Sequence, residues 1–232
     1  MTMVIDEIPG KNTILEVRDL SGGYAKGANV LRHFNLSMTK GEALGIIGAI
    51  GAGKSTLGKA LMNLLPYRSG SVLFQGRDVS RLSTHELSRA GMALMHQGGA
   101  VFPGLTVQQN LDLAWGQNGN KDYRKRLEAV IPLLVKPPRE RLHLQADKLS
   151  GGQRHELALV MTLAHPSAFL ILDEPSAGLS PDAEESAYAI LDDIRKEFGM
   201  SILLIEQNVN RARAFCDRIV EMVPVDDGNG KD

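Results

Sequence analysis

The feature that most constrains this chain is a glycine-rich run at residues 48–55, which reads G-A-I-G-A-G-K-S. It follows an apolar run, Ala43–Ile47, and precedes a helix-compatible stretch, Thr56–Leu65. Its three glycines let the backbone bend tightly, so that consecutive N–H groups can face one anion. The N-terminus of the following helix adds positive potential at the same place. This order of strand, glycine loop and helix predicts a phosphate-binding loop.

The lysine and serine that end the run narrow the expected ligand to a nucleotide. Lys54 is placed to reach the β- and γ-phosphates, and the Ser55 hydroxyl to bind the accompanying Mg²⁺. A glycine-rich turn after a buried strand would explain the glycines but not this pair. We therefore expect the nucleotide to be bound by Gly48, Ala49, Ile50, Gly51, Ala52, Gly53, Lys54, Ser55 and Thr56.

Charge and cysteine content limit the partners and the compartment. The 26 basic residues nearly balance the 27 acidic residues, so we expect no nucleic acid partner. No apolar stretch approaches the roughly 20 residues of a membrane-spanning helix, and the first residues, M-T-M-V-I-D-E, lack the basic-then-apolar order of a secretory signal. Cys216 is the only cysteine, which suits a reducing compartment. We expect a cytoplasmic protein.

Apolar, β-rich runs alternate with helix-compatible segments along the chain, which is typical of an α/β domain with a largely parallel sheet. We predict a single domain over residues 13–223, with flexible polar ends at 1–12 and 225–232. The predicted strands are Thr13–Val17, Ala43–Ile47, Ser71–Phe74, Met92–Met95, Phe169–Leu172 and Ser201–Ile205.

Capping patterns mark several helix starts. Ser180 before Pro181 predicts an N-cap and a first-turn proline that open a helix to about Phe198. The stretch Thr106–Leu163 is mostly helix-compatible, and we interpret it as the main part of a helical subdomain, about residues 98–165, inserted in the core. Two further pairs have the spacing of a capping box, namely Ser83 with Glu86 and Thr106 with Gln109.

Two adjacent acids, Asp173 and Glu174, follow the predicted strand Phe169–Leu172. Ligands of parallel α/β proteins lie at the carboxyl ends of the strands. Asp173 is suited to hold Mg²⁺ through water, and Glu174 to orient or deprotonate an attacking water. Adjacent acids at a strand end are often only a solvated turn, but the phosphate-binding loop upstream favours the catalytic interpretation.

The motif L-S-G-G-Q at residues 149–153 precedes these acids, and the ordered set of motifs resembles the ATP-binding cassette (ABC) ATPase family over nearly the whole chain. The resemblance implies a P-loop NTPase core with ATP as the nucleotide. It also implies that Tyr24, in a G-G-Y motif, stacks on adenine, and that Gln97 contacts Mg²⁺ and the attacking water. The alternatives are an ordinary edge-strand tyrosine and a solvated loop amide.

The resemblance gives L-S-G-G-Q a role in a second subunit. Ser150, Gly151, Gly152 and Gln153 are expected at the ATP bound by the opposite copy, with Ser150 and Gly152 at its γ-phosphate. This implies that the protein acts as a pair, with itself or with a paralogue. The simpler interpretation is a Ser-Gly-Gly turn before a helix. Both interpretations, the contact with a second subunit's ATP and the turn, place these residues at the same helix N-terminus.

Two positions depart from the commonest pattern of the family, and the first is Ser180, where many members have an aspartate. Gln207 stands where most members have a histidine that holds the γ-phosphate. A glutamine amide can donate a hydrogen bond there, but it carries no charge and cannot shuttle protons. The resemblance thus implies catalytic roles for Glu174 and Gln207, while a weakened, regulatory or nonhydrolysing protein remains an alternative.

Four segments in combination are similar to ATPase subunits of bacterial branched-chain amino-acid importers: V-F-P-G-L-T-V at 101–107, S-A-G-L-S-P at 176–181, L-I-E-Q-N at 204–208 and C-D-R at 216–218. The resemblance implies transmembrane permease partners and a place on the inner face of the cell membrane. Val101, Phe102 and Leu105 could hold a short permease helix, or could pack within the helical subdomain. The alternatives are importers of urea, amides or other solutes, and ABC ATPases without transport, whose long coiled coils have no counterpart here.

Overall fold

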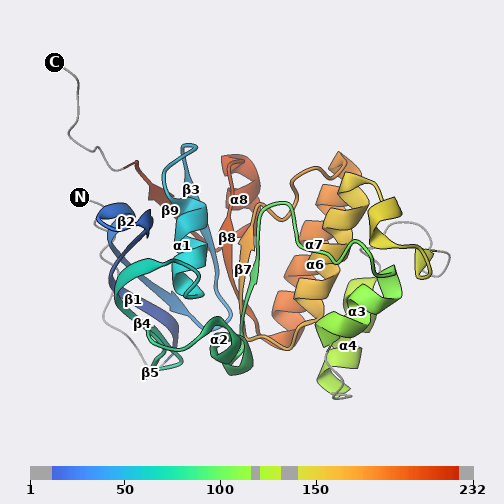
Figure 1. The fold of residues 1–232 in the computed structure, drawn as a ribbon, viewed down its shortest axis with the longest axis horizontal. Helices are drawn as coiled ribbons and strands as arrows, with labels where there is room; N and C mark the ends of the chain where they lie inside the picture. The colour runs from blue at the N-terminus through green and yellow to red at the C-terminus, as the bar shows by residue number, and fades with distance from the viewer. Residues whose placement is uncertain (1–11, 116–120, 132–140, 225–232) are drawn as a thin grey trace.

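The computed structural model describes residues 12–115, 121–131 and 141–224, and these form two sheets with helices around them (Figure 1). The four-stranded antiparallel sheet has the order β2 (Ala28–Thr39), β1 (Thr13–Ala25), β4 (Tyr67–Phe74) and β5 (Arg77–Asp78). The five-stranded parallel sheet has the order β6 (Met92–Met95), β7 (Phe169–Asp173), β8 (Ser201–Ile205), β3 (Ala43–Gly48) and β9 (Arg218–Met222).

The helices lie on both faces of the parallel sheet. In Figure 1, α1 lies toward the antiparallel sheet, whereas α6 and α7 lie on the other side, with α3 and α4 beyond them. The helices are α1 (Lys54–Leu61), α2 (Thr84–Ala90), α3 (Val107–Trp115), α4 (Lys121–Val130), α6 (Gly151–Ala164), α7 (Pro181–Phe198) and α8 (Val209–Phe215), with a 3₁₀ turn, η2 (Ala146–Lys148). In the ranges that the structure describes, none is long and apolar enough to cross a membrane.

The central strands separate two apolar cores because successive side chains of a strand point to opposite faces. All residues of β7 and β8 are buried. Ile171 and Leu203 belong to the core shared with α1 and the antiparallel sheet. Leu172 and Leu204 belong to the core shared with α6 and α7. The helix after the phosphate-binding loop and the helix after L-S-G-G-Q therefore lie on opposite faces of one sheet.

The predicted helix starts are confirmed. The Ser83 hydroxyl accepts from the Glu86 N–H at 3.3 Å, and the Glu86 carboxylate accepts from the Ser83 N–H at 2.7 Å. Helix α7 covers Pro181–Phe198, as predicted. The Ser180 hydroxyl accepts from the Ala183 N–H and so caps α7. Thr106 and Gln109 make the same reciprocal pair of hydrogen bonds as Ser83 and Glu86.

The strand predictions are confirmed in the parallel sheet and need correction in the antiparallel one. Strands β6 and β8 have the predicted bounds, whereas the runs predicted at Thr13–Val17 and Ser71–Phe74 extend into longer strands of the antiparallel sheet. Strands β2 and β9 were not predicted. In β2 the buried residues alternate from Phe34 onward, but a bulge at His33, with φ 49°, breaks the pattern before it.

The helices between residues 106 and 164 pack on one another, α6 with both α3 and α4. The buried Arg126 of α4 donates to the carbonyls of His165, at 3.1 Å, and Ser167, at 3.0 Å. The proposed subdomain, about residues 98–165, includes residues 116–120 and 132–140, which lie outside the described residues. The ends expected to be flexible, 1–12 and 225–232, also lie outside them, except Asn12, whose carbonyl accepts from the Lys40 N–H.

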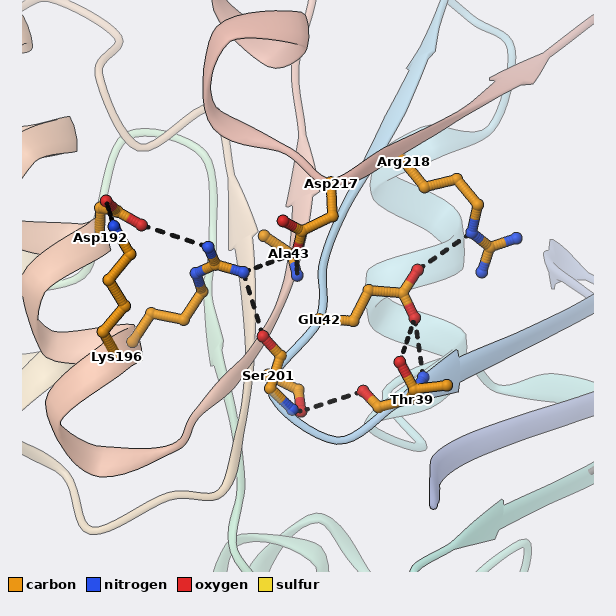
Figure 2. Close-up of polar contacts among 10 residues, drawn as sticks. Thr39, Glu42, Ala43, Asp192, Lys196, Ser201, Asp217 and Arg218 are labelled. Carbon is orange, nitrogen blue, oxygen red and sulfur yellow. Dashed lines mark hydrogen bonds and ion pairs between the residues drawn. The ribbon is translucent and has the colours of Figure 1, made fainter. Parts of the chain in front are cut away.

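Figure 2 shows a polar cluster that includes Glu42 and Asp217. These two residues directly precede β3 and β9, so the cluster lies at the amino ends of the parallel strands, whereas the phosphate-binding loop follows the carboxyl end of β3. We call it the basal cluster: Thr39, Glu42, Asp192, Arg195, Asp217 and Arg218. Arg195 of α7 donates to the Gly41 carbonyl at 3.0 Å and to Asp217 at 2.6 Å. Asp217 in turn accepts from the Ala43 N–H at 2.8 Å. The cluster therefore ties α7 to the starts of β3 and β9.

Candidate nucleotide-binding and hydrolysis site

The loop at residues 48–55 joins the carboxyl end of β3 to the N-terminus of α1. Gly48, Gly51 and Gly53 have φ values of 147°, 84° and 92°, which favour glycine. A Cβ at Gly48 would lie 2.2 Å from the Met222 carbonyl oxygen of β9. The predicted order of strand, loop and helix is confirmed, although the helix covers Lys54–Leu61 rather than Thr56–Leu65. Strand β9 explains why the first loop position has no room for a side chain.

Lys54 is buried at the start of α1. Its ammonium donates to the carbonyl oxygens of Gly48, at 2.7 Å, and Ala49, at 3.0 Å. An ammonium has three donors, so one N–H remains for a phosphate oxygen. The positive end of α1 adds to the attraction for an anion.

The other loop residues differ in exposure. Thr56 and Ala52 are buried, and Ser55 is half-buried. The Ile50 side chain is 84% exposed and points to solvent. A nucleotide contact by Ile50 would therefore come from its backbone rather than from its side chain.

Asp173 is the buried acid at the end of β7, with an exposed fraction of 3%. Among the described residues, its Oδ1 has no hydrogen-bond partner. Burial raises the pKa of this carboxyl, and a hydrogen bond from Ser55 opposes the rise. A buried carboxylate oxygen without a donor, beside a hydroxyl, fits a hard cation such as Mg²⁺. The described residues contain no group of three His, Cys, Asp or Glu side chains suited to a metal.

Glu174 accepts hydrogen bonds from two glutamines. Gln97 Nε2 donates to Glu174 Oε2 at 2.6 Å, and Gln207 Nε2 donates to Glu174 Oε1. The three residues follow β6, β7 and β8, neighbouring parallel strands whose carboxyl ends meet at one edge. Glu174 has φ 50°, which is strained for a residue with a side chain. Both carboxylate oxygens are thus held by neutral donors.

Tyr24 lies near the end of β1, with 51% of its surface exposed. Lys59 of α1 donates to the Tyr24 hydroxyl at 3.2 Å, and its ammonium lies 5.3 Å from the ring centroid. The ring is therefore on the side of the phosphate-binding helix and still accessible. Strand β1 lies between β2 and β4, but its pairing with β4 ends at Gly23 and only β2 pairs with it beyond that residue, so Tyr24 stands at a locally open edge, as the alternative of an edge-strand tyrosine describes. Nothing in the sequence pattern had indicated the contact with Lys59.

Ser150 is the N-cap of α6, where its hydroxyl accepts from the Gln153 N–H at 3.3 Å and its N–H donates to Gln153 Oε1 at 3.0 Å. Gly151 has open space where a Cβ would stand, and a Cβ at Gly152 would lie 3.1 Å from the Gly178 carbonyl. Residues 150, 152 and 153 and the loop at 178–180 line a cavity of about 310 Å³. The predicted turn before a helix is confirmed, on the face of the parallel sheet opposite α1 (Figure 1).

The helix after Ser150 also contacts the loop that follows Glu174. His155 of α6 is buried, and its Nε2 lies 2.6 Å from the Pro175 carbonyl oxygen. A ring N–H donating to this carbonyl would fix the loop against α6. The sequence pattern did not single out His155, because only the folded chain places it beside Pro175.

Comparisons with known proteins agree with this arrangement. The family described as "ABC transporter" matches residues 31–177. The high-affinity branched-chain amino acid transport ATP-binding protein BraG of Pseudomonas aeruginosa is 34% identical, over 81% of this chain and 80% of its own length. The probable branched-chain amino acid transport ATP-binding protein LivF of Archaeoglobus fulgidus is 32% identical, over 90% of this chain and 88% of its own length.

Other relatives are named for different solutes, and a solved structure supports the fold. Two relatives at 31% identity are named for phosphonate import and for methionine import. A solved structure titled as the ATP binding subunit of an ABC transporter is 29% identical, with a TM-score of 0.79, and the match covers 90% of this chain and 86% of that one. The chain therefore belongs to the ABC transporter family, in which it is an ATP-binding and ATP-hydrolysing subunit.

Proposed function

We propose that this protein energises the uptake of a small solute by an ABC importer, and that the solute is a branched-chain amino acid. The hydrolytic part rests on the Glu174 carboxylate, which is held between Gln97 and Gln207 beside the buried Asp173. The choice of solute rests on the similarity to BraG and LivF. Importers of phosphonates, methionine, urea or amides are the alternatives, as is an ABC ATPase that moves no solute.

In the proposed reaction the role of each residue follows from its position. The loop N–H groups and Lys54 bind the phosphates, and the accessible ring of Tyr24 stacks on adenine. Glu174 orients the attacking water and accepts its proton, while the Gln207 amide turns to donate to the γ-phosphate. Mg²⁺, held by Ser55, Asp173 and Gln97, would neutralise charge that develops on the phosphate oxygens.

We further propose that two copies, or this chain and a paralogue, form the working unit. Ser150 and Gly151 are exposed at the N-terminus of α6, across the sheet from the loop at 48–55. A second chain could therefore present its own exposed turn to the ATP bound here. Binding that favours the closed pair and hydrolysis that releases it would supply the work of transport.

The proposed permease contact lies after Gln97, on the inner face of the membrane. Phe102 is 54% exposed, whereas Val101 packs against the core that includes α6. Phe102 is thus the best placed of the predicted residues to meet a permease helix. A cavity of about 370 Å³ nearby, which such a helix could enter, has a mixed lining. It includes the apolar residues Met62, Leu64, Met92, Met95 and Met161 together with Thr84, Ser88, His96, Thr162 and His165.

The proposed solute is tested by uptake in cells whose chromosomal copy carries Lys54→Ala. We expect the initial rate of leucine, isoleucine and valine uptake by this system to fall to background, because phosphate binding is lost. Cells carrying Lys40→Ala, a change at an exposed lysine, serve as the control and should transport normally. Unchanged leucine uptake with loss of methionine or phosphonate uptake would show that the solute is wrong but the importer role right.

Gln207 should contribute directly to turnover. We expect Gln207→Ala to lower kcat for ATP by about 10²-fold, the effect of losing one donor to transition-state charge. Gln207→His should keep most of the activity, since an imidazole N–H can donate to the same oxygen. Steady-state phosphate release from the purified variants measures both. A parental rate in Gln207→Ala would make the residue a bystander.

A further inference from the structure

A second carboxylate, Glu206, is buried directly before Gln207, with an exposed fraction of 5%. Glu206 Oε1 accepts from the Tyr188 hydroxyl at 2.7 Å. Glu206 Oε2 accepts from the backbone N–H groups of Gln207, at 2.9 Å, and Asn208, at 3.2 Å. These three donors are neutral. A buried charge is costly unless its hydrogen bonds are well formed, so the position of this carboxylate is closely determined.

The donors to Glu206 come from separate elements. Tyr188 lies on α7, whereas the Gln207 and Asn208 N–H groups belong to the loop between β8 and α8. Burial raises the pKa of Tyr188, and the Glu206 charge raises it further. The phenol therefore remains a donor over the whole physiological range, and Glu206 links α7 to the loop that carries Gln207.

The loop that follows Glu174 joins the same network. The Ser176 hydroxyl donates to Glu184 Oε1 at 3.1 Å and lies 3.4 Å from Glu206 Oε1. A hydroxyl has one proton to donate, so the shorter contact, to Glu184, is its main bond. Arg211 of α8 donates to Glu184 at 3.1 Å, and its guanidinium lies over the Tyr188 ring, 5.2 Å from the centroid. The two catalytic loops are thus held by one set of side chains.

This geometry defines what Glu206 does for Gln207. The Gln207 N–H is bound to Glu206, while the Gln207 side chain donates to Glu174. The Glu174 N–H in turn donates to the Ile205 carbonyl at 2.9 Å, directly before Glu206. We propose that Glu206, anchored by Tyr188, is a positioning residue that fixes the Gln207 backbone so that the Gln207 amide meets Glu174. This role rests on the proposed function, in which Glu174 and Gln207 act in hydrolysis.

The test begins with two single variants. Glu206→Ala should lower kcat roughly 10- to 100-fold, because a misplacement of about 1 Å at a reacting group can cost that much. Tyr188→Phe, which removes one neutral hydrogen bond and keeps the ring, should lower kcat about fivefold. KM for ATP should stay within about twofold in both, because the phosphate-binding loop is untouched.

A second comparison separates positioning from general damage. In a Gln207→Ala background, Glu206→Ala and Tyr188→Phe should cause no further loss of kcat, because the side chain being positioned is gone. Glu206→Gln should retain most of the parental kcat, since its amide oxygen can accept both backbone N–H groups and its NH₂ group can donate to Tyr188. Arg195→Met, in the basal cluster, is the control: it should lower Tm and leave kcat unchanged.

The outcomes are distinct. Parental kcat in both Glu206→Ala and Tyr188→Phe overturns the positioning role, as does a loss that adds fully to that of Gln207→Ala. Glu206→Gln as slow as Glu206→Ala also overturns it, because hydrogen bonding would then not suffice. If Glu206→Ala does not fold, the double-mutant cycle of Tyr188→Phe and Gln207→Ala by itself tests the positioning role. Parental turnover in Glu174→Gln and Gln207→Ala would instead defeat the proposed function, and the positioning role would fall with it.

Discussion

Glu174→Gln should lower ATP turnover by about 10²- to 10⁴-fold, the range expected for loss of a general base, while ATP affinity stays nearly unchanged. The phosphate-binding loop and Lys54 lie on other elements and keep their contacts. Gln97 and Gln207 both donate to the Glu174 carboxylate. A neutral amide there accepts from only one of them, so one glutamine must turn, and the site can no longer take a proton from water.

The experiment measures steady-state phosphate release together with equilibrium ATP binding. Glu185→Gln makes the same chemical change at an exposed residue of α7 and should behave as the parent. With hydrolysis blocked and binding intact, Glu174→Gln should also accumulate as an ATP-bound pair in sedimentation. Near-normal turnover in Glu174→Gln would refute the assignment of Glu174.

Ser150→Arg should abolish turnover, and an equal mixture of Ser150→Arg and Glu174→Gln should restore part of it. In a mixed dimer both lesions fall on one composite site and the other site is intact. Random pairing makes about half of the dimers mixed, with one intact site of two, so about a quarter of the parental activity should return. Ser150 is exposed, which lets the arginine project toward a partner.

Two controls accompany the mixing experiment. Ser186→Arg, at an exposed serine of α7, should keep its activity. Loss of the Ser150 cap costs about 1 kcal/mol of stability, so Tm must show that Ser150→Arg is folded. Because cooperativity between sites could mask recovery, ATP-dependent pairing is measured by sedimentation in parallel. A chain that hydrolyses at full rate as a monomer, with saturating ATP and permease present, would refute the composite site.

The sequence alone was sufficient to predict those elements whose determining interactions are local. The loop at 48–55 is contiguous, and its glycines and Lys54 serve one short strand–helix connection. The capping pair Ser83 and Glu86 and the whole of α7 were predictable for the same reason, because each cap bonds to a residue three positions away. The acids at the end of β7 were recognisable because the apolar run Phe169–Leu172 is followed directly by charge.

Tertiary structure decided what depends on distant partners. Strand β2 was missed because its pairing with β1 tolerates the bulge at His33. Gln97 and Gln207 reach Glu174 from loops 77 and 33 residues away, since parallel strands bring their carboxyl ends to one edge whatever their separation in sequence. In the sequence, Glu206 is one polar residue after an apolar strand. Only the packing of α7 on the parallel sheet buries it beside Tyr188, because burial depends on what covers a side chain rather than on its neighbours in the chain.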